Sequence, residues 1–152
     1  MTQSLQNFLY DLLAIPSPTG QEADKLAFIY QYVRQHTDDS HCITHTDDGI
    51  IIQSHPDITT RDTGSKPAHI ALVGHADVVP PWHHPTKQGD YLYGSGASDM
   101  QSGLAAIIQI FTDLAHAYKQ SDCILSLIVY TREENTPTRD NGLYALRQAH
   151  PD

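Results

Sequence analysis

The chain has 152 residues, about one domain at roughly 150 residues per domain, and it is long enough to bury a core. Hydrophobic residues make up 39% and charged residues 18%, which excludes a disordered tail and a coiled coil as the main structure. The 18 acidic residues outnumber the 9 Lys and Arg residues, so the formal net charge is −9. Because such a surface repels phosphate backbones, we expect no nucleic-acid partner.

The sequence predicts neither a membrane span nor an export signal. Apolar runs such as residues 124–130 are far shorter than the roughly 20 residues that a membrane-spanning helix needs. The N-terminal stretch MTQSLQNFLYDLL lacks a basic flank and carries Asp11 within its apolar pattern. Cys42 and Cys123 form no CxxC motif and indicate no disulfide framework. We therefore expect a soluble, cytoplasmic protein without a membrane partner.

The first part of the chain predicts two helices followed by two strands. Apolar residues at helical spacing predict amphipathic helices over 5–13 and 23–36. Residues 41–55 fit a pair of short strands around an Asp48-Gly49 turn. Residues 57–67 are polar and rich in turn-forming residues, which predicts an exposed loop.

The rest of the chain predicts strands and helices in alternation. The apolar run at 69–74 is typical of a strand buried on both faces, whereas residues 78–97 show no regular pattern. A long amphipathic helix is predicted over 104–118, a second buried strand over 123–131 and the start of another helix over 140–149. This order predicts an α/β fold with a partly parallel or mixed sheet flanked by helices.

Acidic residues and a histidine gather at the ends of these elements. His75 and Asp77 follow the first buried strand, Glu133 and Glu134 follow the second, and Asp99 precedes the long helix. Ligands in open α/β sheets bind at the carboxyl ends of the strands. We therefore expect these residues to meet at one edge of the sheet.

These residue types suit a metal-dependent hydrolytic site. In an extended chain His75 and Asp77 point the same way, so the carboxylate can hold one ring nitrogen and leave the other for a metal ion. Of the adjacent Glu133 and Glu134, one can bind metal while the other acts as a base on water. Each cluster alone has an ordinary interpretation: a chance HxD pair, a solvated loop or, for Asp99, a helix N-cap. Their coincidence at one sheet edge favours the site.

Three segments of the sequence resemble the M20 family of metallopeptidases. They are GHADVVPPW (residues 74–82), GDYLYGSGASDMQSGLAA (89–106) and YTREENTPTRDNGL (130–143). Their order and spacing agree with the family, which includes succinyl-diaminopimelate desuccinylases, acetylornithine deacetylases, aminoacylases and carboxypeptidases. The resemblance extends over nearly the whole chain and implies the N-terminal portion of a dinuclear-zinc exopeptidase-like catalytic domain.

The resemblance also implies roles for the five residues. His75 resembles the family's metal-binding histidine, Asp77 the aspartate that orients it, and Asp99 the carboxylate that bridges two metal ions. Glu133 matches the general base, and Glu134 the ligand of the metal ion on the other side from His75. The implied cofactors are two divalent ions, zinc first, with cobalt or manganese suited to similar ligands. Substrate-binding residues are not identified.

The implied reaction is hydrolysis of the amide bond in a small N-acylated amino acid. The EE…NGL text resembles some desuccinylases, which favours N-succinyl-LL-diaminopimelate, cleaved to succinate and LL-diaminopimelate. N-acetylornithine deacetylase, aminoacylase and dipeptidase or carboxypeptidase activities stay open. A non-catalytic metal-binding or protein-association remnant is the alternative of another class, and Glu133 beside Glu134 speaks against it. A nucleotide-binding domain is excluded, because GSGASDM lacks the lysine of a phosphate loop and the third glycine of a dinucleotide fingerprint.

Two departures from the family pattern stand out. Ser95 and Gln101 occupy positions where many members have basic residues, which affects contacts around the ligands. Family members also continue beyond the point that matches Asp152, with a further carboxylate ligand, a lid and dimerisation domain, and a second metal-binding histidine. We therefore expect 1–152 to be an incomplete catalytic domain. It would lack the lid through which members often form homodimers.

An incomplete ligand set has consequences for binding and activity. With fewer protein ligands than a catalytic zinc ion usually has, we expect this chain to bind metal weakly and to be inactive alone. His150, at the end of the predicted last helix, offers no convincing substitute. Six other histidines are expected on the surface or in loops: His41, His45, His55, His83, His84 and His116.

Overall fold

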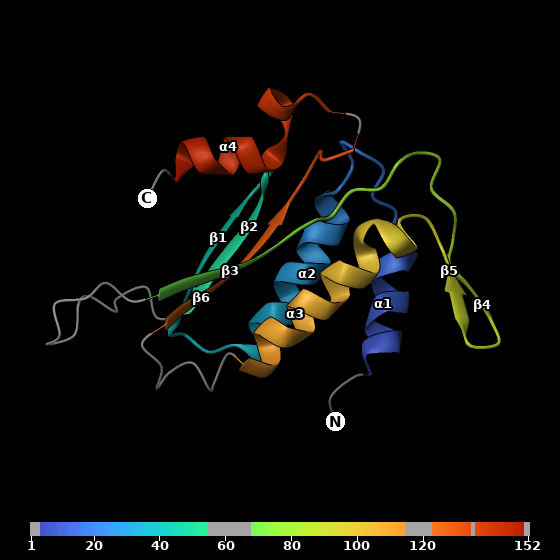
Figure 1. Ribbon diagram of the computed structural model, residues 1–152, viewed down its shortest axis with the longest axis horizontal. Helices are drawn as coiled ribbons and strands as arrows, with labels where there is room; N and C mark the ends of the chain where they lie inside the picture. The colour runs from blue at the N-terminus through green and yellow to red at the C-terminus, as the bar shows by residue number, and fades with distance from the viewer. Residues whose placement is uncertain (1–3, 55–67, 115–122, 135, 151–152) are drawn as a thin grey trace, which may run out of the picture.

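The structure, a computed structural model, describes residues 4–54, 68–114, 123–134 and 136–150. Its main layer is a four-stranded sheet in the order β1–β2–β6–β3 (Figure 1). β1 (His41–Thr46) and β2 (Gly49–Ser54) form an antiparallel hairpin, and β2 pairs antiparallel with β6 (Cys123–Tyr130). β6 pairs parallel with β3 (Ala68–His75). The predicted α/β class with a mixed sheet is confirmed.

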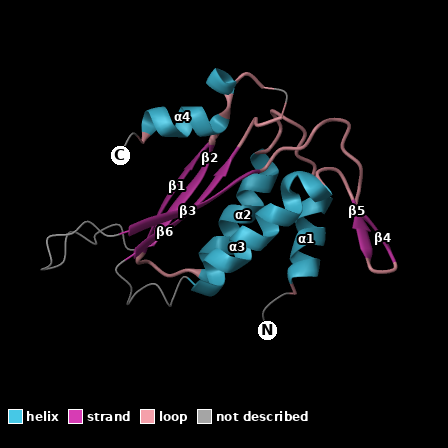
Figure 2. Ribbon diagram, in the orientation of Figure 1, coloured by secondary structure: helices cyan, strands magenta, loops and turns pink. Residues whose placement is uncertain are grey.

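Helices α2 (Ala23–His36) and α3 (Ser102–Leu114) lie against one face of this sheet, and α1 (Leu5–Ala14) packs beside α3 (Figure 2). All three follow the predicted apolar periodicity. The side chain of Ser4 caps the first turn of α1 by accepting the backbone N–H of Asn7 at 3.3 Å. The helical layer therefore covers the sheet face from which the core is built.

Alternate residues of the two central strands form the sheet side of the core. On β2 these are Ile50 and Ile52, and on β6 they are Leu125, Leu127 and Val129, all at most 1% exposed. Burial of each such side chain contributes about 1.5–3 kcal/mol to stability. The buried helix residues that share the core are Phe8, Leu12, Leu26, Ile29, Tyr32, Val33, Leu104, Ala105, Ile108 and Phe111. This packing places β6 in the middle of the sheet and so positions the residues that follow it.

Two smaller units flank the main layers. Helix α4 (Gly142–Ala149) follows a short 3₁₀ turn at Thr138–Asp140 and packs beside β2 and β6 through Leu146, which is buried. Strands β4 (Thr86–Gln88) and β5 (Tyr91–Tyr93) form a separate hairpin that projects from the helical side of the molecule (Figure 1). None of the described helices is long and apolar enough to cross a membrane.

The structure corrects two expectations from the sequence. β3 is not buried on both faces: among the described residues it is an edge strand, with Ile70 and Val73 44% and 39% exposed. Residues 78–97 are not without regular structure, because they contain the β4–β5 hairpin, whose three-residue strands are too short to show an alternation. The expected loop at 57–67 and the end of the helix beyond Leu114 lie outside the described residues.

Candidate metal centre

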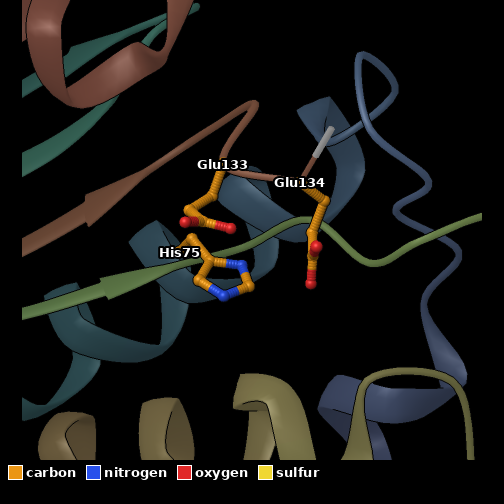
Figure 3. A group of neighbouring side chains, drawn as sticks. All are labelled: His75, Glu133 and Glu134. Carbon is orange, nitrogen blue, oxygen red and sulfur yellow. The ribbon is translucent and has the colours of Figure 1, made fainter. Parts of the chain in front are cut away.

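His75, Glu133 and Glu134 come together at the carboxyl ends of two parallel strands. His75 is the last residue of β3 and pairs in register with Tyr130, the last residue of β6, so both strands end at the same level. One ring nitrogen of His75 and one carboxylate oxygen from each glutamate all lie within 4.8 Å of one another. In Figure 3 both glutamate side chains descend from the segment after β6 toward the imidazole.

Asp99 approaches the same histidine from the helical layer. Its carboxylate oxygen Oδ1 lies 3.4 Å from Nε2 of His75, while the side chain as a whole is 79% exposed. The residue lies in a wide turn, Ala97–Gln101, and has extended backbone angles, φ −131° and ψ 102°. Helix α3 begins only at Ser102, so Asp99 is not its N-cap. The carboxylate is instead positioned beside the imidazole.

The tight conformation of this turn requires a glycine at its start. Gly96 has a φ of +71°, a conformation that side chains disfavour. A Cβ atom there would lie 2.3 Å from Cγ1 of Val78 and 2.9 Å from the carbonyl oxygen of Asp99. The absence of a side chain at Gly96 therefore lets the Asp99 turn pack directly on the segment that follows β3.

Asp77 holds the segment that carries the two glutamates. Its carboxylate is fully buried and accepts the backbone N–H of Glu133 at 3.0 Å and that of Glu134 at 2.9 Å. The hydroxyl of Thr19 donates a further hydrogen bond at 3.0 Å. Burial alone would raise the pKa of Asp77, but hydrogen bonds from His75, these two N–H groups and Thr19 outweigh it and lower the pKa to about 2. Asp77 is therefore an anion that links the ends of β3 and β6.

The backbone of Asp77 also orients the imidazole of His75. Nδ1 lies 3.1 Å from the carbonyl oxygen of Asp77 and 3.5 Å from its carboxylate oxygen Oδ1. A carbonyl oxygen only accepts hydrogen bonds, so Nδ1 carries the hydrogen and Nε2 faces Asp99. Hydrogen bonding through one ring nitrogen is the arrangement that leaves the other for a metal ion.

The charges around the site favour a cation. Burial lowers the pKa of His75, but Asp77, Asp99 and Glu133 together raise it to about 9. Burial and the nearby charge of Asp99 raise the pKa of Glu134, against the opposing effect of His75. Neighbouring carboxylates thus outweigh burial at His75 and add to the effect of burial at Glu134. One imidazole nitrogen with carboxylate oxygens is a donor set that fits zinc and similar divalent ions.

The N-terminal segment supports the site in a way that the sequence did not predict. The Ser17 hydroxyl donates to the carbonyl of Ala76 at 2.9 Å, and the Ser17 carbonyl accepts the N–H of Val78 at 2.9 Å. Glu22, buried just before α2, accepts the N–H of Arg132 at 3.0 Å. The available signal was that Glu22 continues the apolar stripe of α2, where a carboxylate needs buried partners.

Arg132 turns the chain between the end of β6 and the two glutamates. Its φ is +56°, in the left-handed region that non-glycine residues rarely adopt. The guanidinium group contacts the carboxylate of Asp48 and donates from Nε to the carbonyl of Asp140 at 3.0 Å. With the Glu22 bond to its backbone N–H, these contacts hold the residue in this uncommon conformation.

Among the described residues, no other histidine joins the group of His75, Glu133 and Glu134, and one expectation about the other histidines is wrong. His41 is buried at the start of β1, with its ring edge-on to Phe111 at 6.0 Å. The histidines found exposed, as expected, are His45, His83, His84 and His150. His55 and His116 lie outside the described residues. Ser95, one of the two departures from the family pattern, accepts the backbone N–H of His83 at 2.7 Å.

An open cleft of about 600 Å³ adjoins Asp99 and Glu134 of the candidate metal centre. Asp99 and Glu134 form part of its wall, and the hairpin residues Leu92 and Tyr93 form another part. Its remaining lining residues are Val79 and residues 94–98, so no Lys or Arg side chain is among them. The cleft gives a small molecule access to both carboxylates.

Comparison with known proteins connects this site to a family. Residues 71–151 match Peptidase family M20/M25/M40. A succinyl-diaminopimelate desuccinylase of Bradyrhizobium sp. (strain BTAi1 / ATCC BAA-1182) is 32% identical over 148 residues, covering 91% of this chain and 37% of the relative. The chain therefore spans less than two fifths of the length of this curated relative.

Solved structures share the fold. Human carnosine dipeptidase 1 superposes with a TM-score of 0.70 at 17% identity, over 97% of this chain and 35% of that one. The YXEP protein of Bacillus subtilis, described as a dinuclear metal binding peptidase from the M20 family, gives 0.57 at 19% identity, over 86% and 35%. The resemblance seen in the three sequence segments is thus confirmed. The chain belongs to peptidase family M20/M25/M40.

Proposed function

We propose that this chain contributes the metal-binding part of an amidohydrolase, with His75, Asp99 and Glu134 as ligands of two divalent ions, zinc first. The observation that carries the proposal is the convergence of imidazole and carboxylate groups at the ends of β3 and β6, where donor atoms of His75, Glu133 and Glu134 lie within 4.8 Å. Asp99 adds a carboxylate 3.4 Å from Nε2 of the same ring. Family membership supports this assignment.

The proposed chemistry divides between the cation and the protein. A bound divalent ion supplies Lewis-acid polarisation of the scissile carbonyl. Glu133 is the proposed base: it takes a proton from the attacking water and delivers it to the nitrogen of the leaving amine. The C–N bond of the amide breaks, a C–O bond forms, and the products are a carboxylate and a free amine.

The contacts of Asp77 support the placement of these groups at one site. Both glutamate N–H groups are bound to one buried carboxylate, which restricts where the two side chains begin. His75 is held at Nδ1 by the Asp77 carbonyl, so its other nitrogen is available as a ligand. Asp77 acts in this proposal by positioning three groups, and it takes no part in proton transfer.

For the substrate, we propose an N-acylated amino acid, with N-succinyl-LL-diaminopimelate as the first choice. The curated relative named above, a succinyl-diaminopimelate desuccinylase, supports this choice. A second candidate is an N-acetylated amino acid. The described wall of the cleft carries Asp99 and Glu134 but no Lys or Arg, and a neutral acetyl group needs no cation, whereas a succinyl carboxylate does.

The metal part of the proposal is tested on the 152-residue chain. Isothermal titration with zinc should show binding that is lost or weakened in Glu134→Ala and in His75→Ala. The matched control is Asp39→Asn, which removes a fully exposed carboxylate whose closest ion pair is with Arg34. Equal zinc affinity in the wild type and in Glu134→Ala would exclude the assigned ligand set.

The catalytic part is tested by amine release in the presence of zinc. Purified protein is supplied with N-succinyl-LL-diaminopimelate and, separately, with N-acetylornithine, and the two rates decide between the substrates. The Glu133→Gln variant should keep its zinc affinity and lose turnover, because the amide cannot accept a proton. Zinc binding without hydrolysis of either substrate would agree with the expectation that the 152-residue chain is inactive alone, whereas hydrolysis that persists in Glu133→Gln would reject Glu133 as the base.

A further inference from the structure

A lysine side chain is fully enclosed next to the candidate metal centre. Lys25, in the first turns of α2, has no exposed surface, although lysine is almost never fully buried without a partner. Its ammonium group donates to Oε1 of Gln101 at 2.9 Å. Gln101 is also fully buried. The two side chains, 76 residues apart in sequence, form a polar pair inside the protein.

Gln101 also contacts the segment that follows β3. Its Nε2 lies 3.3 Å from the carbonyl oxygen of Ala76 and 3.5 Å from that of Asp77. The orientation of the amide is determined by its partners, since the ammonium of Lys25 can only donate and the two carbonyl groups can only accept. Gln101 also ends the turn that carries Asp99. It therefore joins the two segments that bear His75 and Asp99.

This chain of contacts reaches the imidazole of His75 through the carbonyl oxygen of Asp77. It lies 3.1 Å from Nδ1 of His75 and accepts its hydrogen. Gln101 thus shares an acceptor with His75 and restricts where that acceptor lies. The path runs from Lys25 through Gln101 and the Asp77 carbonyl to the ring whose Nε2 faces Asp99.

This inference rests on the metal centre proposed above. We propose that Lys25 is a positioning residue of that centre: through Gln101, its buried ammonium group fixes the carbonyl oxygen that holds the His75 ring in the orientation for metal binding. Residues that orient a ligand in this way are typically worth a factor of about 10–100 in metal affinity. An ordinary structural role for Lys25 would affect stability alone.

Burial and charge explain why an amine at this place is unusual. Enclosure lowers the pKa of Lys25 to about 7, against the opposing charge of Asp77. An apolar side chain of similar length would fill the same space without this desolvation cost. The retained amine is therefore better explained by its contact with Gln101 than by packing.

The test compares zinc affinity with stability in Lys25→Met. Isothermal titration of the 152-residue chain with zinc should give a Kd about 10–100 times larger in this variant than in the wild type. Its thermal midpoint combines two opposing changes, removal of the buried charge and loss of the donor to Gln101 Oε1, and it does not decide the inference. The matched control is Lys87→Met, which removes an exposed lysine of β4 and should leave both quantities unchanged. An equal Kd in Lys25→Met and wild type overturns the inference.

A second variant covers the case in which Lys25→Met does not fold. Lys25→Met with Gln101→Met replaces both partners by apolar groups and leaves no buried polar atom of the pair unmatched. Because the two residues act in one chain of contacts, the double variant should lose about as much zinc affinity as the single one. Wild-type affinity in the double variant overturns the inference. Absence of zinc binding in the wild type instead rejects the metal centre itself.

Discussion

The carboxylate of Asp77 accepts the backbone N–H of Glu134 at 2.9 Å, although the two residues are 57 positions apart in the chain. Its other oxygen accepts the N–H of Glu133 at 3.0 Å. A residue expected to orient the histidine therefore also ties the end of β3 to the segment after β6. One buried anion thus connects three of the groups in the candidate metal centre.

Replacing this carboxylate should destabilise the fold. In Asp77→Asn one oxygen becomes an NH₂ group that faces a backbone N–H donor, so at least one buried donor loses its acceptor. We expect the free energy of unfolding, measured by urea denaturation, to fall by about 2–3 kcal/mol. The control Asp90→Asn, at an exposed position in the β4–β5 turn, should change it by less than about 0.5 kcal/mol. A similar effect of both variants would mean that the Asp77 contacts contribute nothing to stability.

Two glycines with positive φ allow the cost of backbone strain to be distinguished from the cost of a steric clash. Gly96 (φ +71°) has Val78 Cγ1 2.3 Å from the position of an added Cβ, whereas Gly89 (φ +58°) has no atom within 4 Å. Gly89→Ala should therefore lower the free energy of unfolding by about 1 kcal/mol, the cost of the left-handed conformation alone. Gly96→Ala should lower it by a further 1–3 kcal/mol or so, because neighbouring atoms must move. Equal losses in thermal unfolding of the two variants would contradict the observed packing.

The sequence predicted those helices whose hydrophobic periodicity reflects one buried face. α1 and α2 each place one apolar face on the core, and their predicted ranges agree with the structure to within a residue or two. The convergence of His75 with Glu133 and Glu134 was also predictable, since parallel strands such as β3 and β6 end at the same edge of a sheet.

Features that depend on distant partners could not be predicted in this way. The apolar composition of β3 indicates burial on both faces, yet its position at the edge of the described sheet leaves Ile70 and Val73 exposed. Likewise, the residues next to Lys25 in the sequence do not indicate that it is buried. Its partner Gln101 lies 76 residues away, at the end of the turn before α3. Both outcomes follow from which strands and helices meet, and hydrophobic periodicity contains no such information.

Zinc should stabilise the folded chain through the same ligands. A ligand that binds only the folded state adds about 2.7 kcal/mol of stability when its free concentration is 100 times its Kd. The thermal midpoint of the wild type should therefore rise as zinc is added and return to its starting value with a chelator. His75→Ala should show a smaller rise or none, whereas His83→Ala, at an exposed position, should respond as the wild type does. A full zinc response in His75→Ala would remove that residue from the ligand set.

Lys25 should make stability depend on pH above neutrality. Burial lowers its pKa to about 7 in the folded chain, from 10.5, so between these values the unfolded chain binds more protons than the folded one. Stability therefore rises with pH across this window as the cost of burying a charged amine disappears. Lys25→Met lacks this contribution, so its free energy of unfolding relative to the wild type should be highest below pH 7 and fall toward pH 10.5. Urea denaturation of both proteins across the window measures this difference in the free energy of unfolding. Groups present in both proteins, such as His75, contribute nearly equally to each, so their titration largely cancels. A constant difference between Lys25→Met and the wild type across this window would show that burial does not lower the pKa of the amine.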